Sequence, residues 1–194
     1  MVKLTQIEVD PELLRRACAG DAKAEAELYS VVAPAVFGLV RRLICNRTIA
    51  EDVFQESMVS FFLHLSSFRN AAPIGAWLRQ IAVSKSLMHL RSPWHRMRLE
   101  LDNDLHSADL PEVKLCNFET QTAAQLDLER ALARLSPVTR AIIWLFDVEG
   151  YSHEEIGRLF KRSASFSKSQ VSRGHQKLRA WFEPVAEHSP CASM

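Results

Sequence analysis

Apolar residues recur at helical spacing along most of this chain, and that periodicity limits its fold more than any other feature. In residues 50–68 they fall at i, i+4, i+7, i+8 and i+11, that is, at Phe54, Met58, Phe61, Phe62 and Leu65. This spacing puts them on one face of an α-helix. Similar stripes recur in residues 74–81 and 128–135, whereas strand-like alternation is scarce. The sequence therefore predicts an all-α fold, and its 47 % of apolar residues suffices for a buried core.

Capping residues predict where the helices of the first half begin and end. Asp10 and Asp21 are N-cap residues, and the helix after Asp21 should run to about Ile44. Pro34 lies inside that helix and should kink or split it, because proline removes a backbone donor. A loop over residues 66–73 precedes a further helix that begins near Pro73.

The second half follows the plan of a helix-turn-helix. Ser136 caps one helix, which Gly150 ends. Ser152 and Glu155 form a capping box, in which each side chain satisfies the other's backbone NH. The short helix that they open, about residues 154–160, is followed by a turn and a longer basic helix that ends before Pro184.

The charges are segregated although the net charge is only +1. Residues 57–99 contain six basic side chains and no acid, and residues 156–182 contain seven and no acid. Between them, residues 93–125 hold six acids against three bases. Such clustering is either the footprint of a polyanion-binding protein or a pair of solvated helix faces.

Weak periodicity, two prolines and this acidic excess divide the chain into two small helical domains. We expect a first domain over residues 8–92, a flexible acidic linker over 93–123 with a short helical piece near 113–118, and a helix-turn-helix domain over 124–183. Residues 184–194 form a tail.

The helix of residues 50–68 has a second face besides its apolar stripe. That face is polar at one end and apolar at the other, and consists of Asp52, Gln55, Glu56, Val59 and Leu63. It either docks a partner helix or is buried by a neighbour within the chain.

The basic helix carries the most specific functional signal. Its segment "SKSQVSRGHQKLR", residues 167–179, has four basic residues, three serines and no acid. Val171, Gly174 and Leu178 should face inward, where glycine permits close packing. The outward face then holds short or cationic side chains, namely Lys168, Ser169, Ser172 and Arg173. Such a face suits the major groove of DNA, although a basic amphipathic helix can also lie on RNA or a membrane.

The order of these parts resembles the sigma factors of bacterial RNA polymerase, and more narrowly the two-domain extracytoplasmic-function group. The resemblance rests on "AEDVFQE" at residues 50–56, "AWLRQIA" at 76–82 and "LERALARLSPVTRAIIWL" at 128–145, followed by the helix-turn-helix. It spans roughly residues 8–183. It implies an alternative sigma factor that binds core RNA polymerase, recognises −35 and −10 promoter elements, and promotes melting.

The resemblance also implies site residues. The clamp helices of the polymerase's largest subunit would bind the second face of the 50–68 helix, at Asp52, Gln55, Glu56, Val59 and Leu63. The −10 element, partly as melted single strand, would contact Arg69, Asn70, Arg79, Gln80, Ser84, Lys85 and Arg91. On the spacing alone, Arg79, Gln80, Ser84 and Arg91 lie off the apolar stripe of their helix, free for solvent or a ligand. Trp77 lies on that stripe, so a place in the core is favoured over a stacking platform.

The −35 element would be read as duplex by Arg162, Phe166, Lys168, Ser169, Ser172 and Arg173. Two departures from the family pattern stand out. Ser84 occupies a position where the family commonly has Asn, so the −10 preference should be unusual. The turn "KRSASFSKSQ" matches poorly, and we favour its ungapped alignment over one shifted by a helical turn.

Other classes of function find little support. The four cysteines have no CxxC pair and the seven histidines no ligand spacing, so no metal or cofactor is expected. A nuclease would need clustered acids near the basic zones, which contain none, and the protein is not expected to be an enzyme. The N-terminus lacks the plan of a signal peptide and no apolar run could cross a membrane, which predicts a cytoplasmic protein. The resemblance to sigma factors also implies an anti-sigma protein as a further partner.

Two alternatives remain. The first is a free-standing helix-turn-helix transcription regulator that binds duplex DNA without polymerase, which would need a dimerisation surface or a ligand pocket in the first half. The second is a helical interaction adaptor, which would not bind nucleic acid at all.

Overall fold

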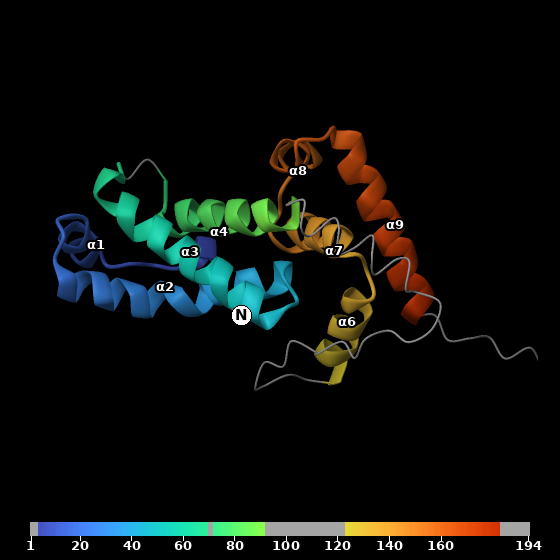
Figure 1. Cartoon of the computed structure of the whole chain (residues 1–194), viewed down its shortest axis with the longest axis horizontal. Coiled ribbons are helices and arrows are strands. Elements are labelled where there is room, and N and C mark those ends of the chain that lie inside the picture. The colour runs from blue at the N-terminus through green and yellow to red at the C-terminus, as the bar shows by residue number, and fades with distance from the viewer. Residues whose placement is uncertain (1–3, 70–71, 92–122, 183–194) are drawn as a thin grey trace, which may run out of the picture.

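A computed structural model of the protein describes residues 4–69, 72–91 and 123–182. These residues form helices and no strand, as the periodicity predicts. The N-terminal half comprises η1 (Leu4–Gln6), α1 (Pro11–Cys18), α2 (Ala22–Leu43), α3 (Arg47–His64), η2 (Leu65–Ser67) and α4 (Ile74–Arg91). The C-terminal half comprises α6 (Ala123–Ala133), α7 (Pro137–Ile143), a π-helical turn (Trp144–Val148), α8 (His153–Phe160) and α9 (Ala164–Phe182). In Figure 1 the two halves lie end to end, with α4 and α7 where they meet.

Side-chain caps begin the helices where the sequence predicts them. Asp10 accepts a hydrogen bond from the backbone N of Leu13 at 3.1 Å, and Asp21 accepts one from that of Lys23 at 2.9 Å. Ser152 and Glu155 form both bonds of the predicted capping box, at 3.2 and 2.8 Å. Each such cap stabilises its helix by about 1 kcal/mol. Helix boundaries are therefore encoded locally in this chain.

The core of the N-terminal half lies between α2, α3 and α4. Phe61, Leu28 and Leu78 are among its fully buried side chains. Pro34 does not split α2, which stays helical from Ala22 to Leu43. Val32 and Val36, on either side of the proline, are fully buried, and their packing holds the helix together.

The helix-turn-helix is formed by α8, a tight turn and α9. Lys161 ends α8 in the left-handed conformation, with φ of 53°. The turn passes so close to Gly157 that a Cβ there would stand 2.9 Å from the carbonyl oxygen of Arg162. Val171 and Gly174 are buried and Leu178 is half-buried, as predicted for the inward face of α9.

The two halves contact one another through α2 with α7 and α4 with α8. Arg140 on α7 is buried, donates from Nη2 to the carbonyl oxygen of Leu43 at 3.2 Å, and contacts the sulfur of Cys45. Arg42 lies over the ring of Trp144, 5.1 Å from its centroid. Apart from Ala123, where α6 begins, the expected linker at 93–123 lies outside the described residues, as do its short helical piece and the tail at 184–194.

Candidate polymerase and nucleic-acid interfaces

The second face of α3 is exposed along its whole length. Val53, Ser57, Met58 and Phe61 turn toward the core, so the predicted residues Asp52, Gln55, Glu56, Val59 and Leu63 lie on the opposite side. Val59 is 58 % exposed and Leu63 is 73 % exposed. No described part of the chain covers this face, which decides against burial by an internal neighbour. Two apolar side chains one turn apart, beside two acids, form a surface suited to a partner.

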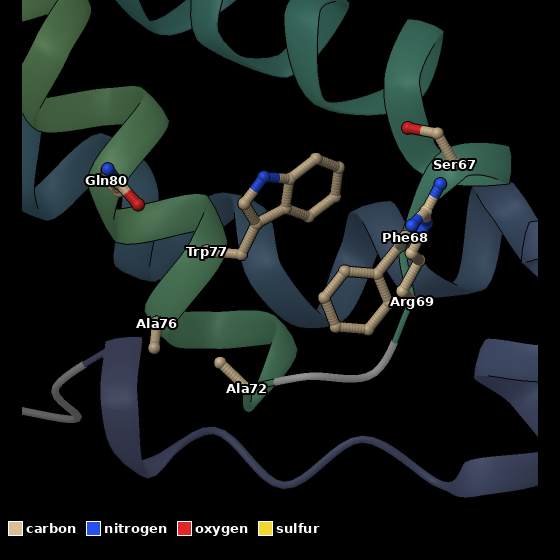
Figure 2. Close-up of a pocket in the computed structure, with 7 residues that line it drawn as sticks. All are labelled: Ser67, Phe68, Arg69, Ala72, Ala76, Trp77 and Gln80. Atoms are coloured by element: carbon tan, nitrogen blue, oxygen red, sulfur yellow. The ribbon is translucent and has the colours of Figure 1, made fainter.

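A small aromatic hollow lies between the loop after η2 and the first turns of α4. The Trp77 ring packs on buried Phe61 and stacks on Phe68, with centroids 5.3 and 5.1 Å apart. The hollow holds about 330 Å³ and is lined by Ser67, Phe68, Arg69, Ala72, Ala76, Trp77 and Gln80. Figure 2 shows the Phe68 and Trp77 rings facing one another, with Gln80 one turn further along α4. Trp77 therefore packs at the edge of the hydrophobic core and also lines the aromatic hollow.

The remaining predicted −10 residues divide into two groups. Arg69, Gln80 and Ser84 are exposed, and half-buried Lys85 has its Nζ 3.8 Å from a carboxylate oxygen of Glu56. Asn70 lies outside the described residues. The second group, Arg79 and Arg91, is turned toward the C-terminal half rather than outward.

Arg79 and Arg91 therefore differ from the expectation that they are free for solvent or a ligand. Arg79 Nη1 donates to the carbonyl oxygen of Glu149 at 2.9 Å and lies 3.7 Å from its carboxylate. The same guanidinium sits over the Tyr151 ring, 4.6 Å from the centroid. Burial raises the pKa of the Tyr151 hydroxyl above its ordinary value, so this ring stays neutral. Arg91 Nη1 donates to the carbonyl oxygen of Leu159 at 2.9 Å.

The outer face of α9 is exposed and cationic, as predicted. Lys168, Ser169, Ser172 and Arg173 are exposed in the first half of the helix, and Arg162 is exposed in the turn before it. These positions suit a recognition helix, whose N-terminal residues reach base edges. This face of α9 offers two cationic side chains, Lys168 and Arg173, for contacts with phosphate or guanine. It also offers two serine hydroxyls for shorter contacts.

Phe166 occupies a different position from the other predicted −35 residues. Its half-buried ring packs against Phe160, with centroids 6.1 Å apart. Gln170, which lies next to the predicted set, accepts a hydrogen bond from Thr139 at 2.7 Å. Both side chains support α9 on the helices beneath it.

Sequence reasoning missed the contacts that Glu149, Tyr151 and Arg140 make with the N-terminal half. Each comes from a segment far away in the chain, so no local pattern signals it. Within the described residues, no three His, Cys, Asp or Glu side chains gather in a way that could hold a metal ion. Nor is any helix of that part of the chain long and apolar enough to span a bilayer.

Comparisons with known proteins agree with this arrangement. The Sigma-70 region 2 family matches residues 28–96, and the Sigma-70 region 4 family matches residues 125–178. The chain is 32 % identical over 166 residues to ECF RNA polymerase sigma factor SigE of Mycolicibacterium smegmatis, covering 84 % of this chain and 62 % of that protein. It is 30 % identical over 169 residues to ECF RNA polymerase sigma factor SigM of Mycobacterium tuberculosis, covering 87 % and 82 %.

A solved structure shares the fold. The sigma factor RpoE, in a co-crystal structure with the anti-sigma factor NepR from Bartonella quintana, matches with a TM-score of 0.56 and 24 % identity. The match covers 82 % of this chain and 97 % of that one. On the two family matches and these relatives, the chain belongs to the ECF sigma factors, alternative transcription initiation factors that act through RNA polymerase.

Proposed function

We propose that this sigma factor reads a −35 element as duplex DNA with the outer face of α9. The observation that carries this assignment is the acid-free exposed face of Lys168, Ser169, Ser172 and Arg173 on a helix-turn-helix. Arg162 adds a cation at the turn. Phosphate contacts from lysine position the helix, and an arginine reaching a guanine supplies specificity. Phe166 contributes by holding the start of α9 against Phe160.

The −10 element is recognised at the other end of the molecule, around the aromatic hollow and α4. A base that leaves the duplex loses a few kcal/mol of stacking and pairing. The Phe68 and Trp77 rings offer a stacking surface, worth about 1–3 kcal/mol per base in proteins that hold single strands. Arg69 and Gln80 line the same hollow with donors for a phosphate or a base edge. Capture of one unstacked base there would favour the melted promoter.

Ser84 and Lys85 extend this surface along α4. The serine hydroxyl is shorter than the family's asparagine and offers one donor instead of two. Arg79, Arg91 and Asn70 complete the −10 set by resemblance. We therefore expect an altered −10 preference rather than a loss of recognition.

Core polymerase binds the second face of α3. Exposed Leu63 and Val59 supply the apolar contact with the clamp helices of the largest subunit, and Asp52, Gln55 and Glu56 supply polar contacts beside it. Such an arrangement is typical of interfaces in which a few buried anchors carry most of the binding energy.

The remaining assignments follow from this function. Residues 8–92 and 124–183 act as two domains joined by residues 93–123. The protein contributes no catalytic group or cofactor of its own and works in the cytoplasm, where polymerase and chromosome meet. RpoE of Bartonella quintana forms a complex with an anti-sigma factor, and we infer that a protein of that class restrains this chain too.

A selection experiment tests the proposal. The chain and core polymerase together are used to retain DNA from a random-sequence duplex pool, with core polymerase alone as the control. Two sequence blocks at a fixed spacing are expected in the retained DNA. A single block, or one that appears without polymerase, would instead indicate a free-standing regulator.

A further inference from the structure

Lys161, between α8 and α9, has a backbone conformation that favours glycine. Among the described residues it is the only one besides glycine with a positive φ, 53° with a ψ of 44°. Gly20 and Gly150 also have positive φ. The left-handed region is costly for a residue with a Cβ and nearly free for glycine, which commonly stands where a helix ends in this way. A lysine at this position therefore carries a conformational cost that a glycine would not.

The turn of the helix-turn-helix requires this conformation. Only residues 161–163 separate α8 from α9. The backbone N of Lys161 donates to the carbonyl oxygen of Arg158 at 3.1 Å, and that of Arg162 donates to the carbonyl oxygen of Gly157 at 2.8 Å. The turn runs so close to Gly157 that a Cβ there would stand 3.1 Å from the backbone N of Ala164. The fold thus explains the conformation of position 161, but not why the residue is lysine.

The ammonium group of Lys161 makes no ion pair with the described part of the chain. Its side chain is exposed, and residues 156–182 contain no acid. A cation near the C-terminus of a helix interacts favourably with the helix dipole, but Arg158 already supplies one in the last turn of α8. Within the described residues, the lysine therefore has a conformational cost and no compensating contact.

We propose that Lys161 binds a backbone phosphate of the −35 duplex. In a helix-turn-helix the second helix enters the major groove while the first crosses the DNA backbone, so the turn between them lies at the edge of the groove. In this protein the turn lies at the outer edge of the C-terminal half (Figure 1), and exposed Arg162 stands next to Lys161. The inference rests on the proposed reading of the −35 element by α9, and it adds a residue that holds this helix on the DNA backbone.

Folding and DNA binding then make opposite demands on position 161, because glycine suits the turn and lysine suits the phosphate. A phosphate contact carries no sequence information, so Lys161 adds the same affinity for every −35 sequence. It also releases a counterion from the DNA, which makes binding more sensitive to salt. Both properties distinguish this role from that of a residue that reads a base.

Three substitutions separate the two demands. Lys161→Gly removes the charge and the backbone strain, Lys161→Gln removes the charge alone, and Lys161→Arg removes neither. Lys23→Gln, at an exposed position of α2, is the control for loss of a lysine elsewhere. Each full chain is assembled with core polymerase and titrated with the duplex that wild type and polymerase retain from the random-sequence pool.

The binding measurements should show the loss of one phosphate contact. The ratio of wild-type to Lys161→Gln affinity should be about threefold larger at about 50 mM salt than at about 200 mM salt. That ratio should be the same for duplexes with single-base changes in the −35 block. Lys161→Gly should lose affinity in the same way, whereas Lys161→Arg and Lys23→Gln should bind like wild type.

The stability measurements should show the opposite order. In urea, Lys161→Gly should have an equilibrium constant of unfolding about twofold smaller than wild type or less, because relief of the left-handed strain exceeds the entropy that glycine adds to the unfolded chain. Lys161→Gln keeps the strain and should unfold like wild type. A variant that is more stable and yet binds DNA less well is not explained by damage to the fold.

Other results overturn the assignment. If Lys161→Gln binds like wild type at both salt concentrations, the lysine does not contact DNA, and the proposed function stands without it. If Lys161→Gln unfolds more easily and binds DNA normally, the lysine only stabilises the end of α8. A loss of affinity that depends on one base of the −35 block means base reading instead of phosphate contact. If wild type and polymerase retain no duplex from the pool, the proposed function itself has failed.

Discussion

Gly174 on α9 packs directly against Ile143 on α7, with no space for a Cβ atom between the two helices. The methyl group of Thr139 closes the same gap, 2.9 Å from where that Cβ would stand. This contact fixes how closely the basic helix lies on its support. It also explains why a glycine, which weakens most helices, occurs in the middle of this one.

Replacing this glycine should destabilise the C-terminal half. Gly174→Ala forces α9 away from Ile143, and such overpacking costs about 1–3 kcal/mol, more than the roughly 1 kcal/mol that alanine gains in helix propensity. Chemical denaturation of the full chain measures the free energy of unfolding. Ser172→Ala, at an exposed position on the same helix, should leave it nearly unchanged. A Gly174→Ala protein as stable as wild type would contradict the close packing.

The exposed face of α3 should contribute to polymerase binding and little to folding. Asp52→Ala combined with Glu56→Ala should weaken binding to core polymerase by about 1–2 kcal/mol or more, a typical loss at interface anchors. Unfolding of the variant should match wild type, because both side chains are exposed. The comparison protein carries Glu27→Ala and Glu154→Ala, two exposed acids elsewhere. Equal affinities of the two variants for core polymerase would show that the α3 face is not part of the polymerase interface.

Arg173 should read the −35 duplex. Arg173→Ala is expected to cost about 1–3 kcal/mol of specific binding and to relax the preference at one base position. Arg179→Ala removes the same charge further along α9 and should weaken binding evenly across sequences, if at all. Titrations of holoenzyme with single-base promoter variants make the comparison. A loss from Arg173→Ala that is the same for every variant would indicate phosphate contact alone.

Ser84 should set the unusual part of the −10 preference. Ser84→Asn supplies the longer amide found commonly in the family, with a second N–H donor and an acceptor on a separate atom. We expect a shift in the yield of open complexes among −10 variants, with Ser172→Asn as a matched change on α9. Identical open-complex yields across those variants would rule out Ser84 as a determinant.

The capping box should contribute a pH-dependent part of stability. Accepted hydrogen bonds from the backbone and side chain of Ser152 hold the pKa of Glu155 below its ordinary value of 4.5. The unfolded chain therefore takes up this proton first, and the stabilisation is present above pH 4.5 and lost as pH falls through the lower folded pKa. Glu155→Gln keeps an acceptor without the titration.

Urea unfolding at several acidic pH values tests that prediction. Wild type should lose more stability than Glu155→Gln on acidification below about pH 5. Other acids contribute equally to both proteins, so the difference isolates position 155. Parallel pH profiles would mean that the carboxylate adds nothing to the cap.

Features encoded by neighbouring residues could be predicted from the sequence. The caps at Asp10, Asp21 and Ser152 depend on side chains that bond within three positions, so local patterns reveal them. The same holds for the inward face of α9, where helical spacing alone orders Val171 and Gly174. Spacing also groups the residues of the α3 face opposite the apolar stripe, but it leaves open whether a neighbour within the chain covers them, and only the structure shows that they are exposed.

Contacts between the halves could not be predicted in this way. Arg79 and Glu149 are 70 positions apart, and Arg91 and Leu159 are 68 apart. Periodicity places both arginines off the apolar stripe of α4. It does not indicate which residues of the C-terminal half they contact. Burial of Val53 and Ser57 was missed for a related reason, because α3 is packed by both α2 and α4. From the sequence alone, Pro34 is expected to kink or split its helix, because the burial of Val32 and Val36 on either side of it is known only from the structure.

The most direct test of the sigma assignment is to reconstitute the chain with core RNA polymerase on fragments of the source genome and map the transcript starts. The account predicts starts that share two motifs at a fixed spacing and that disappear with the Asp52→Ala, Glu56→Ala variant. Binding to DNA with no sigma-dependent start, from wild type that is folded, would contradict it.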